Sequence, residues 1–186
     1  MIPRLEFDPE EHRFTAEGRP VPSVTGVLKD LGFIDTRWYN DEARDRGTYV
    51  HAACTFIDEE RLNWKKVPEQ YQGYLKAYIA WKDYTKFRIQ SNEVLVSNRE
   101  FWYAGWVDKV GILWRHKTII DLKTGGEADW HKLQSAAYGL CFPRKPQRYT
   151  LYLKEDGKYS MKASHDDEVD YWDWRCIMRT YWRKNG

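Results

Sequence analysis

Two carboxylates and one lysine stand in short, strand-like segments in the middle of the chain. Asp108 lies in the run Gly105-Trp-Val-Asp-Lys, and Asp121 and Lys123 lie in the run Ile119-Ile-Asp-Leu-Lys. Because residues two apart on an extended strand share a face, Asp121 and Lys123 project together while the residue between them points into the core. Paired carboxylates beside an ammonium group can hold a divalent cation and steer a water molecule at a phosphodiester.

The two aspartates can meet only if their strands pair. A turn at Trp114-Arg115 would bring Asp108 beside Asp121. Carboxylates at that distance repel and raise each other's pKa, so they are tolerated mainly where a cation lies between them or a lysine neutralises one. The alternative interpretation is a structural Asp–Lys pair at the rim of a sheet, since such pairs are common.

The hydrophobic periodicity predicts an α/β protein. Runs rich in β-branched and aromatic residues are typical of strands, and three of them follow one another: 92–97, 101–111 and 118–123. A hairpin joined by Glu155-Asp-Gly is predicted over 149–161, and a smaller one over 5–15. Helical periodicity is found in five segments: one opening at Pro22 with Ser23 or Thr25 as N-cap, 40–59, 68–87, 129–140 and about 166–183. The aromatic stripe of segment 68–87 is interpreted as core packing.

These elements predict a central mixed β-sheet, made of a three-strand meander plus a hairpin and flanked by helices. With no repeat or linker in its 186 residues, the chain is expected to form one domain. This domain would have an N-terminal helical part, about 20–88, and a sheet-bearing catalytic core, about 89–165, closed by a C-terminal helix. No apolar run approaches the roughly 20 residues of a membrane span or resembles a signal peptide, so we expect a cytoplasmic protein with no membrane contact.

The net charge of +2 is too small for whole-molecule attraction to nucleic acid, so phosphate contacts must come from local clusters. On the last helix Arg175, Arg179 and Arg183 recur along one side with Trp172. This stripe is a candidate for contacts to a nucleic-acid backbone, and the alternative is a solvated basic face. Trp38-Tyr39 is a candidate for stacking on an unpaired base.

Taken together, the motifs resemble the PD-(D/E)xK nuclease superfamily, and within it the RecB-type exonucleases with a QxxxY motif. Segment 105–111 resembles the family's G-x-(V/I)-D strand, with Val107 where the superfamily's name has proline, and segment 120–125 resembles its (I/V)-D-x-K-T strand. Gln134-Ser-Ala-Ala-Tyr138 fits QxxxY, and Arg46-Gly-Thr-Tyr-Val-His51 resembles the RG-x-x-x-H helix. The motifs occur in the family's order over roughly residues 20 to 140.

The resemblance implies a restriction-endonuclease-like core and a metal-dependent DNA nuclease, with exonuclease action expected. It assigns catalysis to three residues: Asp108, Asp121 and Lys123. It assigns metal binding to His51, Asp108, Asp121 and the backbone carbonyl of Leu122. Glu93 is a further metal-binding candidate, with three alternatives open: it binds the metal through water, it holds a second ion, or it only pairs with Lys109. Contacts to substrate or support of the site are expected from Gln134 and Tyr138, and substrate contacts from Arg46, Arg175 and Arg179.

The expected cofactor is Mg²⁺ or Mn²⁺, as one or two ions, and a His51 nitrogen among oxygen ligands favours Mn²⁺. Several RecB-type nucleases carry an iron–sulfur cluster on four cysteines, but three scattered cysteines predict no such cluster here. The absence of a glycine-rich phosphate motif predicts no nucleotide cofactor. The expected partner is DNA, as single strands or duplex ends. The family further implies a recombination or helicase protein partner and a role in recombination, repair or processing in a bacterial or phage-infected cell.

Two interpretations from other functional classes stay open. One is a module on the same fold that binds nucleic acid without cutting it, although intact Asp108, Asp121 and Lys123 argue against this. The other is a structural protein in which these residues form only rim pairs.

Overall fold

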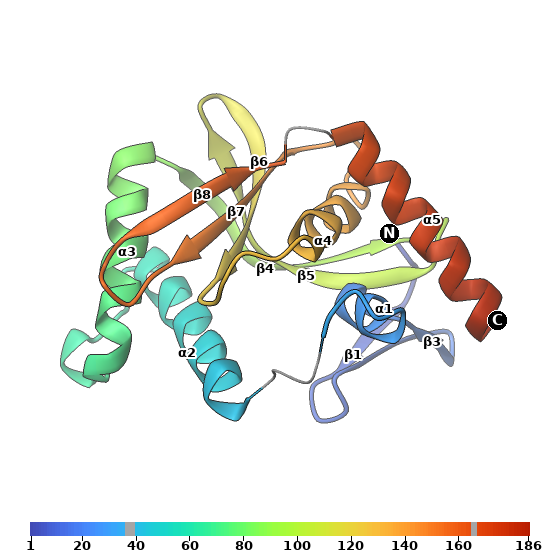
Figure 1. The fold of residues 1–186 in the computed structure, drawn as a ribbon, viewed down its shortest axis with the longest axis horizontal. Helices are drawn as coiled ribbons and strands as arrows, with labels where there is room; N and C mark the ends of the chain where they lie inside the picture. Colours follow the sequence, from blue (N-terminus) through green and yellow to red (C-terminus); the bar gives the residue numbers. More distant parts are fainter. Residues whose placement is uncertain (36–39, 165–166) are drawn as a thin grey trace.

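A five-stranded mixed sheet runs through the middle of the molecule in the computed structural model, which describes residues 1–35, 40–164 and 167–186 (Figure 1). Its strands lie side by side in the order β4 (Arg88–Asn98), β5 (Tyr103–Leu113), β6 (His116–Lys123), β7 (Gln147–Leu153) and β8 (Tyr159–Ala163). β6 and β7 are parallel, and the other neighbours are antiparallel. The predicted α/β architecture, with a three-strand meander and a hairpin in one mixed sheet, is therefore confirmed.

The parallel pair of strands determines where the helix with Gln134 lies. Two parallel neighbours need a crossover connection, because the chain must return to the same end of the sheet before it starts the second strand. Helix α4 (Trp130–Gly139) makes this crossover between β6 and β7. It begins a short loop after Lys123, the last residue of β6. The crossover thus places Gln134 beside the strand that carries Asp121 and Lys123.

Helices cover both faces of the sheet. Helices α1 (Val24–Asp30), α4 and α5 (Asp167–Asn185) share one hydrophobic cluster with Ile119 of β6. Helices α2 (Asp41–Asp58) and α3 (Glu69–Thr85) share the other cluster with Ile120 and Leu122. Successive residues of β6 therefore point to opposite layers, as the period of two requires. The aromatic stripe of α3 is buried in the second cluster, which confirms its interpretation as core.

The N-terminal segment is a three-stranded antiparallel sheet of β1 (Leu5–Asp8), β2 (Arg13–Ala16) and β3 (Arg19–Val21). The sequence predicted only a two-stranded hairpin here. Strand β3 was missed because it has three residues and contains Pro20, which has no amide hydrogen to donate. The Ala104 N–H donates to the Pro22 carbonyl at 3.0 Å, which joins the end of this segment to β5.

The helix boundaries follow local capping. The Ser23 hydroxyl accepts from the Gly26 N–H at 3.0 Å, and the Asn40 side chain accepts from the Ala43 N–H at 2.7 Å, so both helices start where the sequence places a cap. A short 3-10 helix, η2 (Trp64–Lys66), precedes α3. No helix within the described residues is long and apolar enough to cross a membrane. The predicted stacking pair Trp38-Tyr39 lies outside the described residues.

Candidate metal centre and cleft

The β5–β6 hairpin brings the two aspartates to the same level of the sheet. Its turn consists of Trp114 and Arg115, which both have positive φ angles, 47° and 73°, as a tight two-residue hairpin turn requires. Asp108 directly precedes the cross-strand pair formed by Lys109 and Ile120, and Asp121 directly follows it. The Leu122 N–H donates to Asp108 Oδ2 at 2.6 Å. The predicted turn at Trp114-Arg115 therefore has the predicted effect.

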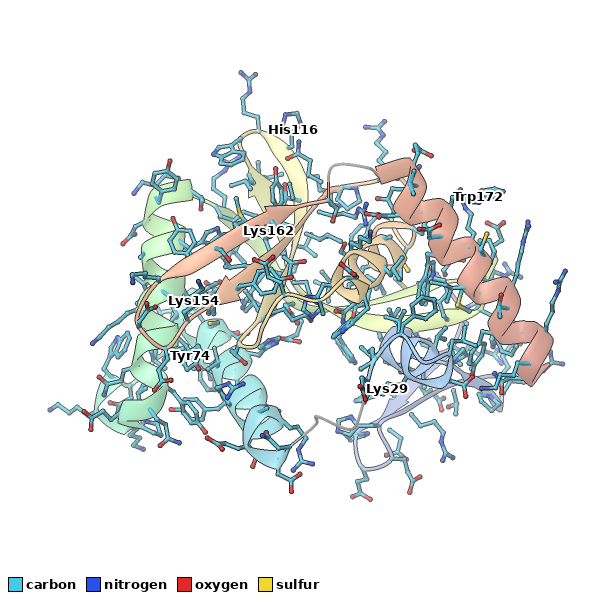
Figure 2. The ribbon with its side chains drawn as sticks, in the orientation of Figure 1. Lys29, Tyr74, His116, Lys154, Lys162 and Trp172 are labelled. Carbon is cyan, nitrogen blue, oxygen red and sulfur yellow. The ribbon has the colours of Figure 1, made fainter. Side chains whose placement is uncertain are left out.

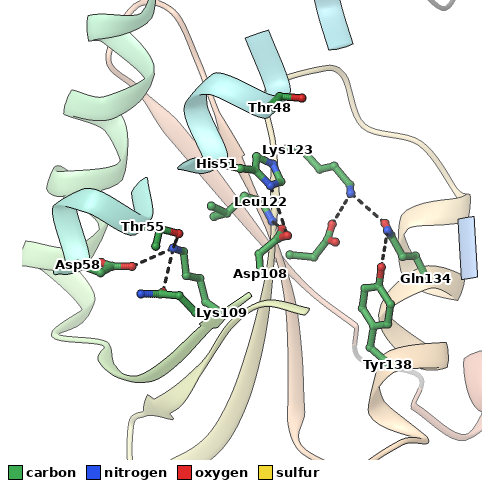
Figure 3. A network of polar contacts seen from close by, with 12 residues as sticks. Thr48, His51, Thr55, Asp58, Asp108, Lys109, Leu122, Lys123, Gln134 and Tyr138 are labelled. Atoms are coloured by element: carbon green, nitrogen blue, oxygen red, sulfur yellow. Dashed lines mark hydrogen bonds and ion pairs between the residues drawn. The ribbon is translucent and has the colours of Figure 1, made fainter. Parts of the chain in front are cut away.

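Lys123 is held from two sides (Figure 3). Its Nζ lies 2.6 Å from Asp121 Oδ2 and donates to Gln134 Oε1 at 2.9 Å. Gln134 in turn donates to the Tyr138 hydroxyl at 3.0 Å. Both α4 side chains are only 5% exposed. Of the two roles expected for Gln134 and Tyr138, contact with a phosphate or support of the site, this geometry favours support.

His51 and Glu93 complete the group of potential metal ligands. His51 Nδ1 lies 3.3 Å from Asp108 Oδ1. A dashed line marks this contact in Figure 3. Among the residues with described positions, one ligand atom each from His51, Glu93 and Asp108 lie within 4.8 Å of one another. Glu93 has a φ of 46°, which is strained for a non-glycine residue in a strand and costs about 1–3 kcal/mol. Such strain beside a cluster of carboxylates is typical of functional positions.

The charges in this cluster compensate one another unevenly. Burial acts most strongly on both aspartates and by itself would raise both pKa values. For Asp108 the contacts with His51, Lys123 and the Leu122 N–H outweigh burial, and its pKa lies below the usual value. For Asp121 burial prevails over the attraction of Lys123, and its pKa is raised to about 6. Burial would lower the pKa of His51, but the Asp108 carboxylate raises it.

The donor set fits a divalent cation. Imidazole nitrogen and carboxylate oxygens are ligands that Mn²⁺ accepts readily, and carboxylate oxygens suit Mg²⁺. Asp121 Oδ2 is buried, and no donor in the described part of the chain makes a well-oriented hydrogen bond to it, although Lys123 Nζ is close enough to form an ion pair. A buried anionic oxygen in this state is poorly compensated, and a bound cation would compensate it.

A cleft of about 1020 Å³ opens beside Lys123 and His51. Arg46 and the first turn of α4 also line it, and Arg46 Nε donates to Thr124 Oγ1 at 3.4 Å. A second hollow of about 580 Å³ is lined by His51 and Glu93, so that His51 stands between two depressions. The structure thus brings Arg46 to the same cleft as the candidate catalytic lysine.

The arginines of α5 are not part of this cleft. Arg175 and Arg179 are absent from its lining residues, and Arg179 borders a separate depression near the C-terminus. On α5 Trp174 is buried, whereas Trp172, predicted on the side of the arginines, is 59% exposed on the outer side of the helix (Figure 2). The role of the two arginines as DNA contacts stays a prediction.

A buried charge network that the sequence did not reveal anchors α2 to the sheet. Lys109 is fully buried, and its Nζ lies 2.9 Å from Asp58 Oδ2 and donates to Thr55 Oγ1 at 3.1 Å (Figure 3). The suggested alternative pairing of Glu93 with Lys109 is therefore wrong, because Asp58 is the carboxylate partner of the lysine. Thr55 and Asp58 follow His51 by about one and two helical turns, on the same side of α2. The spacing of His51, Thr55 and Asp58 on one side of a predicted helix was the sequence feature from which this network could have been expected.

The comparisons with known proteins bear on the fold. A scan against models of protein families and a search of curated proteins each found no match. Among solved structures, a crystal structure of a candidate exonuclease from Eubacterium rectale is similar, with a TM-score of 0.52 and 14% sequence identity over 86% of this chain and 71% of that chain. At this identity the likeness shows a shared α/β fold alone.

Proposed function

We propose that this protein is a metal-dependent DNA nuclease of the PD-(D/E)xK type that hydrolyses phosphodiester bonds and acts as an exonuclease. One observation carries the proposal. Side chains from three segments that are distant in sequence, those of His51, of Asp108, and of Asp121 with Lys123, meet in one mostly buried polar cluster at the edge of a large cleft. The fold shared with a candidate exonuclease agrees with this interpretation.

In this proposal His51, Glu93, Asp108 and Asp121, with the carbonyl of Leu122, hold Mg²⁺ or Mn²⁺. The bound ion would supply a water molecule of lowered pKa and would stabilise negative charge on the phosphate. The protein's own residues pre-arrange the rest of the site. The Leu122 N–H orients Asp108, and the His51 ring is oriented by Asp108 Oδ1.

Lys123 acts on the reacting phosphate. Its second partner, Gln134, is a neutral amide that keeps Nζ at the site even when the Asp121 carboxylate is engaged by a cation. From this position the ammonium group orients the attacking water or neutralises charge that develops on a phosphate oxygen. No covalent intermediate is needed. Arg46, with no carboxylate partner among the described residues, is placed to contact the DNA backbone in the cleft.

A cleavage assay on DNA labelled at either end tests the proposal. Single-stranded and duplex substrates are incubated with Mg²⁺, Mn²⁺ or EDTA. The Lys123→Ala variant should lose at least about 100-fold in rate while it keeps its fold and most of its affinity for Mn²⁺. Lys117→Ala is the matched control, because Lys117 is an exposed lysine at the other end of the same strand.

The outcomes separate the three functional classes. Metal-dependent degradation that depends on Lys123 supports the nuclease. DNA that is bound but left intact supports a non-cleaving module, and neither binding nor cleavage supports a structural protein. Rapid cleavage by Lys123→Ala would contradict the role of the lysine. A role in recombination, repair or processing, with a helicase or recombination protein as partner, belongs to the same proposal and follows from the resemblance in sequence motifs.

A further inference from the structure

The first turn of α4 exposes a second polar site to the cleft. His131 lines the cleft together with Lys123, although its side chain is only 5% exposed. It lies one turn before Gln134, on the same side of the helix, so α4 presents both residues toward the end of β6. Asp129 precedes the helix without making a side-chain cap, and of the first-turn amides the His131 N–H donates to the Ala128 carbonyl at 3.1 Å.

The contacts of the His131 ring determine its tautomer. Its Nδ1 accepts from the Ala128 N–H at 3.3 Å and lies 2.7 Å from the Tyr152 hydroxyl. A backbone N–H can only donate, so Nδ1 must carry the lone pair, and in the neutral ring the hydrogen is on Nε2. The ring is indeed neutral, because burial, assisted by the charge of Lys123, lowers its pKa to about 3.

The remaining ring nitrogen, Nε2, has no hydrogen-bond partner among the described residues. It is not among the fully enclosed polar atoms without a partner, so it is open to solvent. His131 lines both the cleft and an adjoining hollow of about 430 Å³, and Tyr152, the partner of Nδ1, lines only the second of these. A largely buried N–H donor normally has an acceptor. The partial positive charge at the N-terminus of α4 favours a negatively charged acceptor at this position.

We propose that the first turn of α4, with the His131 Nε2–H as its side-chain donor, binds a phosphate of the nucleic acid in the cleft, next to the phosphate that is cleaved. This inference deepens the proposed nuclease function and rests on it for the identity of the ligand. A neutral donor suits the position because a second cation there would repel Lys123 and compete for Asp121. Neutral histidines at helix N-termini serve as hydrogen-bond donors in other enzymes.

Two substitutions separate this role from a structural one. His131→Asn keeps an acceptor oxygen where Nδ1 stands, and thus the bonds from Ala128 and Tyr152, but removes the donor at the Nε2 position. His131→Gln places an amide N–H near the Nε2 position. His116→Asn is the control, because His116 lies at the outer end of β6 with an exposed side chain (Figure 2).

Binding of a short oligothymidylate is measured by fluorescence anisotropy in EDTA, so that the result does not depend on cleavage. His131→Asn should raise the dissociation constant by about 10- to 100-fold, the effect of losing a hydrogen bond to a charged group. His131→Gln should recover much of the affinity, and His116→Asn should bind as the unmodified protein does. An oligomer with uncharged methylphosphonate linkages should not distinguish His131→Asn from the unmodified protein.

Nitrogen-15 NMR of the unmodified protein provides a second measurement that does not require any variant to fold. It should show an unprotonated Nδ1 and a protonated Nε2 on His131, with the Nε2–H signal shifted when oligothymidylate is added. An Nδ1–H tautomer, unchanged affinity in His131→Asn, or no oligothymidylate binding by the unmodified protein would overturn the inference. Metal-dependent cleavage that persists in His131→Asn with unchanged affinity would overturn this inference alone. His131-dependent binding without any cleavage would overturn the nuclease proposal alone.

Discussion

Replacing Asp121 with asparagine should stabilise the metal-free protein while it removes the proposed activity. Burial raises the pKa of Asp121 from its ordinary 3.8 to about 6. A raised pKa means that the folded protein binds this proton more tightly than the unfolded chain does. The associated stability is complete below about pH 4 and is lost as the pH rises through about 6. Above that range the ionised carboxylate weakens the fold.

The size of the effect follows from the pKa shift. At about 1.4 kcal/mol per pKa unit, a shift from 3.8 to about 6 corresponds to a cost of about 3 kcal/mol in the free energy of unfolding at about pH 8. Asparagine is close in shape to the protonated acid and carries no charge to desolvate. The free energy of unfolding of Asp121→Asn should therefore exceed that of the unmodified protein by up to about 3 kcal/mol at about pH 8. The difference should be about half of that at pH 5 and almost nothing below about pH 4.

Asp108→Asn is the matched control because the second carboxylate has the opposite pKa shift. His51, Lys123 and the Leu122 N–H hold the pKa of Asp108 below its usual value, so its ionised form stabilises the fold, and that stability is lost only as the pH falls through the folded-state pKa. Replacing it weakens a charged hydrogen bond and the contact with His51. We expect Asp108→Asn to destabilise the protein by about 1–3 kcal/mol near neutral pH.

Urea denaturation in EDTA, followed by tryptophan fluorescence between about pH 5 and pH 8, measures both variants. The two aspartates should differ in the sign of the effect on stability, although both variants should lack metal-dependent cleavage. Added Mn²⁺ should stabilise the unmodified protein and have little effect on Asp121→Asn. If Asp121→Asn is less stable than the unmodified protein at about pH 8, the assignment of a poorly compensated, buried charge to Asp121 is refuted.

Three further changes test the support of the site. Lys109→Met removes the fully buried lysine that pairs with Asp58 at 2.9 Å, while Lys82 still pairs with Asp58 at 2.6 Å. The variant should lower the free energy of unfolding by about 1–3 kcal/mol, and urea denaturation that shows no loss would contradict this. Gly105→Ala puts a methyl group 2.7 Å from the Tyr138 ring. It should lower the free energy of unfolding by about 1–3 kcal/mol and slow cleavage. An unchanged melting temperature and an unchanged cleavage rate would refute close packing at this position. His51→Gln should weaken Mn²⁺ binding more than Mg²⁺ binding, as measured by calorimetry. Equal losses of affinity for the two ions would contradict the assignment of the His51 imidazole as a metal ligand.

Local patterns explain which parts of the site could be predicted. Asp121 and Lys123 share a face because every strand has a period of two, and Gln134 and Tyr138 share a face because they are four residues apart on a helix. The hairpin turn at Trp114-Arg115 was predictable from the break between two strand-like runs. Each of these features depends on residues that are close in sequence, and each is present in the structure.

The partners of these residues could not be read in the same way. The sequence did not reveal that Lys109 would choose Asp58 over Glu93, because that choice depends on how α2 packs against the sheet. The neutral state of His131 depends on its burial and on the charge of Lys123, and its Nδ1 meets Tyr152 of β7 only because the crossover brings α4 beside that strand.

The sequence by itself determined the α/β fold, the strand and helix periods, and the residue types able to bind a metal and a phosphate. Only the tertiary structure decided that ligand atoms of His51, Glu93 and Asp108 lie within 4.8 Å of one another and that Lys123 is shared between Asp121 and Gln134. The physical reason is the distance along the chain over which each effect acts. Backbone periodicity acts over a few residues, whereas burial and charge pairing depend on which distant segments the folded chain brings into contact.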